Sequence, residues 1–354
     1  MLRSLPALAL ALAAAGAAPA GAAEITEIPP FLRGDLAIGY GFQHLGGSLV
    51  EGEEEVGQRT WDEHGLTYQG VFSAGPGVAL FFELPQVLSS RLAFPAAQEM
   101  VYDPSSESGT MAGTEAIEGL EAVKGSGAEG LWIGIKGTPF SQAFEKRGNR
   151  ATWLLEGALQ TRSRGNFYEL DEEGARGAGV GGGGLRLGTA FSTRHGISEP
   201  YLAFRYTRTR DLTVSLYSTD GTLLAADAIL EPADQVEVEA GTELVVHDNA
   251  ESHSRFAFDL RGSFGYATWQ TVPSGLFLPS VLEINRGVPA TESEYTWIGG
   301  SLALRHQVFA YMAWNLTFGL DYQAPHRVEH LYAVRTGSDT LELYGGAGIK
   351  VMIR

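Results

Sequence analysis

The sequence of 354 residues contains no cysteine. Disulfide bonds are therefore excluded, and so is a lipid anchor on an N-terminal cysteine. Beyond the N-terminal region no stretch holds about eighteen apolar residues in a row, which excludes a membrane-spanning helix there. Basic residues are also scarce, since 25 Lys and Arg stand against 42 Asp and Glu. The formal net charge of −17 would repel phosphates, so no nucleic-acid partner is expected.

The first residues have the pattern of a secretory signal peptide. Arg3 provides the basic region, a run rich in Leu and Ala follows, and Ala20-Gly21-Ala22 is a small-residue cleavage site, with residues 18–20 as the alternative. An uncleaved anchor helix is disfavoured because the apolar run is short and ends in a cleavage-like site. We therefore expect residues 1–22 to be a signal peptide and residues 23–354 to form the mature domain. Export without cysteine fits a bacterial envelope protein better than a small secreted scaffold.

The C-terminal residues alternate between apolar and other side chains. The apolar set occupies every second position and consists of Leu341, Leu343, Gly345, Ala347, Ile349, Val351 and Ile353. Period-two alternation of this length predicts a strand between hydrocarbon and a wet space. The same pattern recurs about twelve times, over residues 35–43, 66–72, 78–84, 131–135, 151–159, 185–191, 202–206, 236–247, 256–266, 298–304, 312–322 and 341–353.

The connections between these segments alternate in length. They are long over residues 45–65, 85–130, 161–177, 218–235, 268–294 and 324–339, and shorter over residues 74–77, 138–150, 193–200, 248–251 and 306–310. The sequence therefore predicts an all-β fold, a single antiparallel up-and-down transmembrane β-barrel of about 12 strands with short periplasmic turns and long extracellular loops. A soluble exported β-sandwich is the alternative, but it would not need one set of loops to be consistently longer.

Together these features resemble Gram-negative outer-membrane β-barrel proteins over the whole mature length. The resemblance implies a place in the bacterial outer membrane, contacts with outer-membrane lipid and lipopolysaccharide, and folding by the outer-membrane assembly machinery. In that class the last strand carries an assembly signal, a Gly followed at +3 and +5 by apolar residues, which Gly348, Val351 and Ile353 match. The chain departs from the class at Arg354, where an aromatic residue is usual.

Charged residues on the polar faces of the strands are the candidate site residues. A charge facing lipid at the bilayer centre would cost about 2–4 kcal/mol, so these side chains are expected to line the lumen. They are Asp35, Glu83, Lys136, Glu156, Arg186, Arg205, Arg255, Asp259, Arg261, Arg305, Asp321, Glu342 and Lys350. We expect Asp259 to lie between Arg255 and Arg261. The set forms either a charged constriction that selects solutes or ion pairs that fill a narrow barrel.

Aromatic residues share the polar faces of the strands. Phe81, Trp132, Tyr201, Tyr295, Trp297, Tyr311 and Tyr344 belong either to a slide for sugars or aromatic compounds, or to filling and interface positions. Catalysis has little support, because His253 and Ser254 are adjacent and would point to opposite faces. No cofactor or metal site is expected. The leading hypothesis is a porin-like channel for small solutes; the alternatives are a non-conducting structural or surface-interaction barrel with acidic loops, and an outer-membrane lipid hydrolase.

Overall fold

The computed structural model describes residues 28–29, 32–51, 54–102, 111–116, 122–141, 151–163, most of 165–179, 182–217, 222–249, 251–273, 289–330, 333–337 and 340–353. The predicted signal peptide, residues 1–22, lies outside the described residues, as does Arg354. No helix in the described part of the chain is long and apolar enough to cross a membrane.

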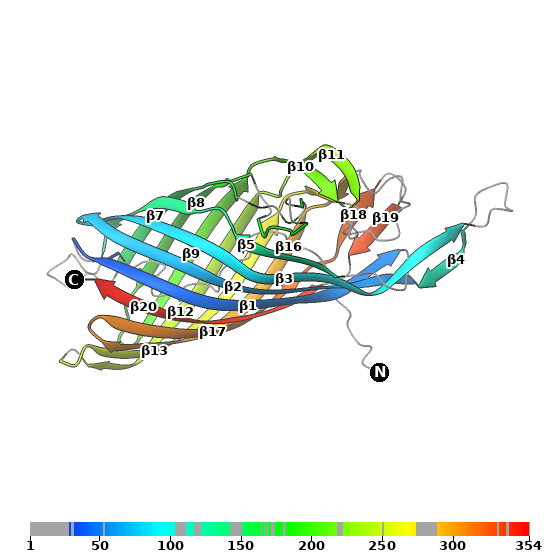
Figure 1. Cartoon of the computed structure of the whole chain (residues 1–354). Coiled ribbons are helices and arrows are strands. Elements are labelled where there is room, and N and C mark those ends of the chain that lie inside the picture. The colour runs from blue at the N-terminus through cyan, green and yellow to red at the C-terminus, as the bar shows by residue number, and fades with distance from the viewer. Residues whose placement is uncertain are drawn as a thin grey trace, which may run out of the picture.

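Twelve long strands form the wall of a closed antiparallel barrel (Figure 1). Each pairs with the next, and the last pairs with the first, so the wall has no free edge. The predicted fold class is confirmed, and every expected strand is present. The wall strands are β1 (Gly34–Glu51), β2 (Glu54–Gly75), β3 (Val78–Tyr102), β6 (Trp132–Phe140), β7 (Ala151–Gln160), β8 (Gly184–Thr193), β9 (Ser198–Thr209), β12 (Gln235–Asn249), β13 (Ser254–Ala267), β16 (Tyr295–Phe309), β17 (Met312–Gln323) and β20 (Thr340–Ile353).

The two ends of the barrel differ. At one, which we call the turn end, two-residue turns join β2 to β3 through Pro76 and Gly77 and β16 to β17 through Ala310 and Tyr311. Gly77 has φ 73°, a left-handed conformation that favours glycine. The opposite end, the loop end, carries further short strands: β4 (Met111–Ala116), β5 (Val123–Ala128), β10 (Leu212–Tyr217), β11 (Leu223–Leu230), β14 (Gln270–Pro273), β15 (Pro289–Glu292), β18 (His326–His330) and β19 (Ala333–Gly337).

Two of the predicted long loops are largely strand. The segment 45–65 continues β1 and β2, which pair from Gly34 with Phe72 as far as Glu51 with Glu54. The segment 85–130 begins as the continuation of β3 and contains β4 and β5. These extensions lack the apolar alternation of the barrel wall, because beyond the membrane neither face of a strand has to meet hydrocarbon.

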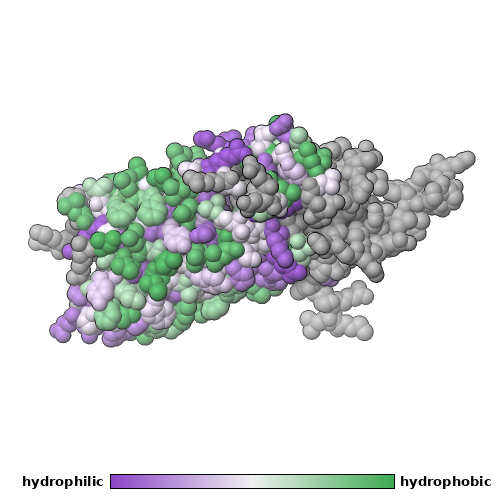
Figure 2. Space-filling view, in the orientation of Figure 1, coloured by the Kyte–Doolittle hydropathy of each residue, from purple (hydrophilic) through white to green (hydrophobic). Residues whose placement is uncertain are grey.

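The outer wall of the barrel is apolar. Outward side chains such as Ile38, Ile133 and Phe318 are exposed, the last by 61 %. Figure 2 shows hydrophobic residues covering much of the barrel on the side in view, with hydrophilic residues gathered toward the strand ends. Val351 and Ile353 of β20 lie on this face, 46 % and 43 % exposed. Such a belt suits contact with lipid rather than with water.

Glycines on the inner wall make room for large neighbours on the next strand. The Phe81 ring occupies the space that a Cβ on Gly134 would fill, and the Trp297 indole does the same at Gly265. The Tyr344 ring likewise lies over Gly319. Large inward side chains therefore lie along the wall rather than across the barrel, which leaves space at its centre.

Folded structure covers part of the loop end. The Trp61 and Phe167 rings pack with centroids 5.0 Å apart, and Phe167 is fully buried. Arg176 donates hydrogen bonds of 3.2 Å to the carbonyl oxygens of Phe167 and Tyr217. The connection before β8 is thus tied to the tip of β2 and to β10, so the loop end is a packed cap in this region.

Candidate functional site

A cavity of about 470 Å³ occupies the barrel interior. Its lining includes Asp35 and Lys350 near the turn end and Gln270 and Thr340 at the loop end, so it extends along the barrel. Pro29, ahead of β1, also contributes to the lining. Ten of the thirteen charged candidates line this cavity: Asp35, Glu83, Lys136, Glu156, Arg186, Arg205, Arg261, Asp321, Glu342 and Lys350.

The other three candidates are not among the residues that line this cavity. Arg255 and Arg305 line a smaller cavity of about 120 Å³ near the turn end. Asp259 is 1 % exposed, and it accepts a 2.9 Å hydrogen bond from the Tyr201 hydroxyl. Of the aromatic candidates, Tyr311 does not line the lumen, because it lies in the β16–β17 turn and is 56 % exposed, which fits the interface alternative rather than the slide.

One charged cluster joins β3, β6, β7 and β8 across the lumen wall. The Arg186 Nε donates to Glu156 Oε1 at 2.9 Å, and Arg186 Nη2 lies 3.5 Å from Glu83 Oε2. Lys136 Nζ lies 3.4 Å from Glu156 Oε2. The Arg186 guanidinium also lies 4.8 Å from the centre of the Trp132 ring, a cation–π distance. In this cluster, carboxylates and an aromatic ring together bind the Arg186 guanidinium, a cation that the chain itself supplies.

A second cluster occupies the wall formed by β9, β12 and β13. Arg205 Nη1 donates to Glu237 Oε2 at 3.0 Å. Arg261 Nη1 donates to Glu239 Oε1 at 3.2 Å, and Arg261 Nη2 lies 3.5 Å from Asp259 Oδ2. Sequence reasoning missed the two glutamates, although both alternate with valines at 236 and 238. In the sequence, this alternation indicates a row of acidic side chains that faces the lumen.

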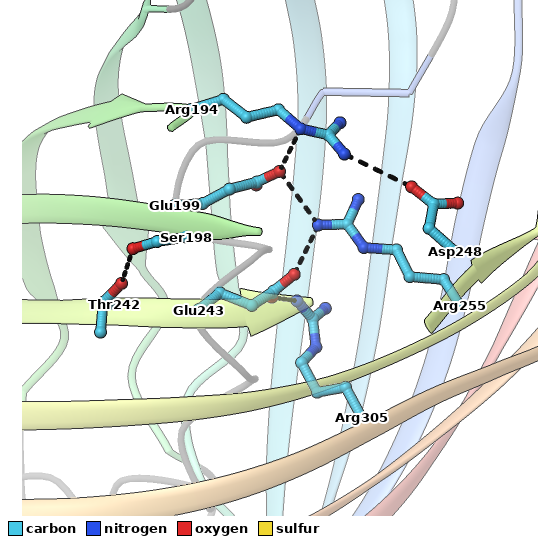
Figure 3. Close-up of polar contacts among 8 residues, drawn as sticks. All are labelled: Arg194, Ser198, Glu199, Thr242, Glu243, Asp248, Arg255 and Arg305. Carbon is cyan, nitrogen blue, oxygen red and sulfur yellow. Dashed lines mark hydrogen bonds and ion pairs between the residues drawn. The ribbon is translucent and has the colours of Figure 1, made fainter. Parts of the chain in front are cut away.

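A third cluster ties together strands at the turn end (Figure 3). It is a chain of ion pairs that links Asp248 to Arg194 at 3.4 Å, Arg194 to Glu199 at 3.3 Å, Glu199 to Arg255 at 3.3 Å, Arg255 to Glu243 at 2.6 Å and Glu243 to Arg305 at 2.8 Å. The residues come from β9, β12, β13, β16 and the β8–β9 connection. Alternating charges on neighbouring strands stabilise this rim of the barrel.

The expected position of Asp259 between two arginines is wrong in one respect. Asp259 contacts Arg261, but Arg255 pairs with Glu199 and Glu243 instead. Positions 255 and 259 are four residues apart on one strand, which separates their Cα atoms by about 13 Å. The two arginines therefore belong to different clusters.

The closing seam of the barrel has its own ion pair. Lys350 Nζ on β20 lies 3.0 Å from Asp35 Oδ2 on β1. Nearby, Gly348 of the predicted assembly signal faces inward, and a Cβ there would collide with the Asn315 carboxamide oxygen of β17. A larger residue at 348 would therefore displace the Asn315 side chain. Whether Gly348, Val351 and Ile353 are read by an assembly machinery stays a prediction.

The loop-end half of the cavity is acidic. Glu63, Glu129, Asp321 and Glu342 line it, and none of them has a Lys, Arg or His within ion-pairing distance among the described residues. Glu63 was expected in a loop, but it lies on β2 opposite Gln43. Burial raises the pKa of the Glu129 carboxyl, which precedes β6, to about 8, and the nearby Glu63 and Glu83 charges add to this rise.

Three of the histidines have polar side-chain partners among the described residues. On the outer face, His44 Nδ1 lies 2.6 Å from Asp62 Oδ1, and the Tyr40 hydroxyl lies 2.7 Å from His64 Nδ1. At the loop end, His326 Nε2 lies 2.6 Å from Glu292 Oε1 in a buried pair. No group of three or more His, Asp or Glu side chains is placed to hold a metal ion within the described ranges.

Comparison with solved structures shows which known proteins share this fold. An outer-membrane channel from Pseudomonas putida F1 has a similar structure, with a TM-score of 0.52 and 12 % identity over 94 % of this chain and 100 % of that one. The TodX monoaromatic hydrocarbon channel (TM-score 0.41, 8 % identity, 91 % and 90 % covered) and a FadL homologue of Pseudomonas aeruginosa (0.38, 8 %, 91 % and 90 %) are too distant to carry an argument. No protein-family model and no curated protein sequence matches the chain.

Proposed function

We propose that this protein is a passive channel of the bacterial outer membrane and that small polar solutes cross through the barrel lumen. The observation that carries the proposal is the cavity of about 470 Å³, whose charged and polar residues extend from Asp35 and Lys350 to Gln270 and Thr340. The apolar outer belt suits lipid and lipopolysaccharide. The turn end then faces the periplasm and the loop end the cell surface, and the last strand serves the assembly machinery.

The lumen wall supplies polar groups in place of water. Arg186 and Arg205 are held at its surface by Glu156 and Glu237, so their charges are oriented and partly compensated. A solute passing through exchanges part of its hydration shell for these groups. The glycines that accept large side chains, such as Gly265 beneath Trp297, keep the path free of bulky obstruction.

A non-conducting structural barrel is the competing function. It is favoured by one observation: each basic side chain that lines the main cavity has a carboxylate partner, as in Arg261 with Glu239 and Lys350 with Asp35. Such pairs can hold a narrow barrel together without any passage of solute. The packed cap around Phe167 also favours the non-conducting barrel.

Liposome swelling with a neutral pentose separates the two functions. Ala203 and Leu202 are adjacent on β9, and Ala203 lines the cavity whereas Leu202 is 54 % exposed on the outer face. A channel should lose most of its swelling rate in Ala203→Trp and keep it in Leu202→Trp. Absence of swelling with the wild-type protein would favour the structural barrel, and equal rates in both variants would place the path outside the lumen.

A further inference from the structure

Two places on the lumen wall combine carboxylates with aromatic rings, and they differ in one respect. In the first, Glu83 and Glu156 with Phe81 and Trp132 surround Arg186. In the second, Asp321 and Glu342 lie near Tyr344, and the described residues place no Lys or Arg in ion-pairing contact with either carboxylate. The second place, nearer the loop end, therefore has the chemistry of a cation site without a cation from the chain.

The strand register defines this second place closely. Asp321 on β17 is directly opposite Glu342 on β20, and Gly319 is opposite Tyr344. On β17 itself, Gln323 lies two residues beyond Asp321, on the same inward face. Residues directly opposite have Cβ atoms about 5 Å apart, and like charges in such a pair are destabilising. Two carboxylates side by side on the wall thus favour a cation between them.

Buried polar atoms without partners point to a ligand independently of the charge. Within the described residues, Gln323 Nε2, Asp321 Oδ1 and Glu239 Oε2 are buried and have no hydrogen-bond partner. Gln323 and Glu239 are each only 6 % exposed, and all three residues line the same cavity. A buried donor or acceptor left unpaired costs about 1–3 kcal/mol, so a guest that pairs with these atoms gains affinity.

We propose that Asp321, Glu342, Gln323 and Tyr344 form a binding site for small organic cations. The inference rests on the proposed function, since it makes the lumen a path with a defined stopping point. The ammonium group lies between the two carboxylates, and its apolar substituents lie against the Tyr344 ring. Gln323 donates its amide hydrogen to an oxygen on the solute. An inorganic divalent ion fits less well, because the described residues contain no cluster of three ligands for it.

Calorimetric titration of the folded protein in detergent tests the site. The probes are choline and neohexanol, its uncharged carbon isostere. Wild-type protein should bind choline at least tenfold more tightly than neohexanol, which is about 1.4 kcal/mol. Asp321→Asn and Glu342→Gln should each weaken choline binding about tenfold and leave neohexanol unchanged. Asp35→Asn is the matched control, because it also removes one lumen charge but from a carboxylate that Lys350 already partners.

The outcomes are distinct. Equal affinity of the wild-type protein for choline and neohexanol overturns the site, and so does an Asp35→Asn variant that loses as much choline affinity as Asp321→Asn. If one site variant fails to fold, the other decides. Binding in detergent does not depend on conduction: a protein that binds choline but passes no current keeps the site and loses the channel. A protein that conducts without preferring choline keeps the channel and loses the site.

Discussion

Replacing Glu243 by Gln should be the most destabilising conservative change in the barrel wall. Glu243 is 2 % exposed and holds two arginines, with Arg255 Nη2 at 2.6 Å and Arg305 Nη1 at 2.8 Å. Gln keeps the shape and one acceptor oxygen but removes the charge between two cations. Removal of one partner from a buried ion pair costs about 3–5 kcal/mol, and the retained acceptor places the expected loss near the lower limit, about 3 kcal/mol.

Urea unfolding in lipid vesicles, followed by the electrophoretic shift between folded and unfolded barrel, measures this loss. The matched control is Glu237→Gln on the same strand, β12. The Glu237 and Arg205 side chains are 26 % and 43 % exposed, so their pair should contribute only about 0–1 kcal/mol. Equal losses in the two variants, or a Glu243→Gln protein within about 1 kcal/mol of wild type, would refute the assignment of the turn-end chain of ion pairs as a stabilising network.

Further predictions address selectivity, assembly, topology and pH. Arg261→Glu should move the reversal potential in a salt gradient toward cations, and an unchanged potential would remove Arg261 from the selective region. Ile353→Asp should cause unfolded protein to accumulate in the periplasm, whereas the same change at inward Met352 should be milder; equal accumulation would contradict the face assignment. Ser105→Cys should react with an impermeant thiol reagent on intact cells, and reaction only after membrane rupture would invert the topology. The Glu129 carboxyl has a pKa of about 8 in the folded protein against 4.5 in the unfolded chain, so the free energy of unfolding should fall as pH rises between these values. Glu129→Gln should flatten that slope, and a slope unchanged in the variant would assign the effect to other groups.

The barrel wall could be predicted from the sequence because lipid imposes a simple rule. Every second residue of a wall strand must be apolar, and runs such as Phe256 to Tyr266 obey it. The short strands at the loop end, β4, β5, β10, β11, β14, β15, β18 and β19, are not bound by this rule, since none of them has to present one face to lipid. In β10 the apolar residues Leu212, Val214 and Leu216 do alternate, but over six residues only, and runs this short between long connections are predicted as loops.

The lumen could be predicted only as a set of faces. Alternation shows that Arg261 and Arg255 point inward, but it does not show which carboxylate each one meets. That depends on the register between strands far apart in the sequence, which brings Glu199 beside Arg255 and Tyr201 beside Asp259. Glu237 and Glu239 alternate with valines in the sequence, but their arginine partners lie on other strands, so only the register shows which pairs they form.

The current through single molecules in planar lipid bilayers tests the central claim most directly. A channel with the cavity described here should insert as discrete steps of stable conductance, and Ala203→Trp should reduce the size of each step whereas Leu202→Trp should not. A correctly folded, heat-modifiable protein that inserts and passes no current would contradict the claim. In that case the paired charges of the lumen would be structural.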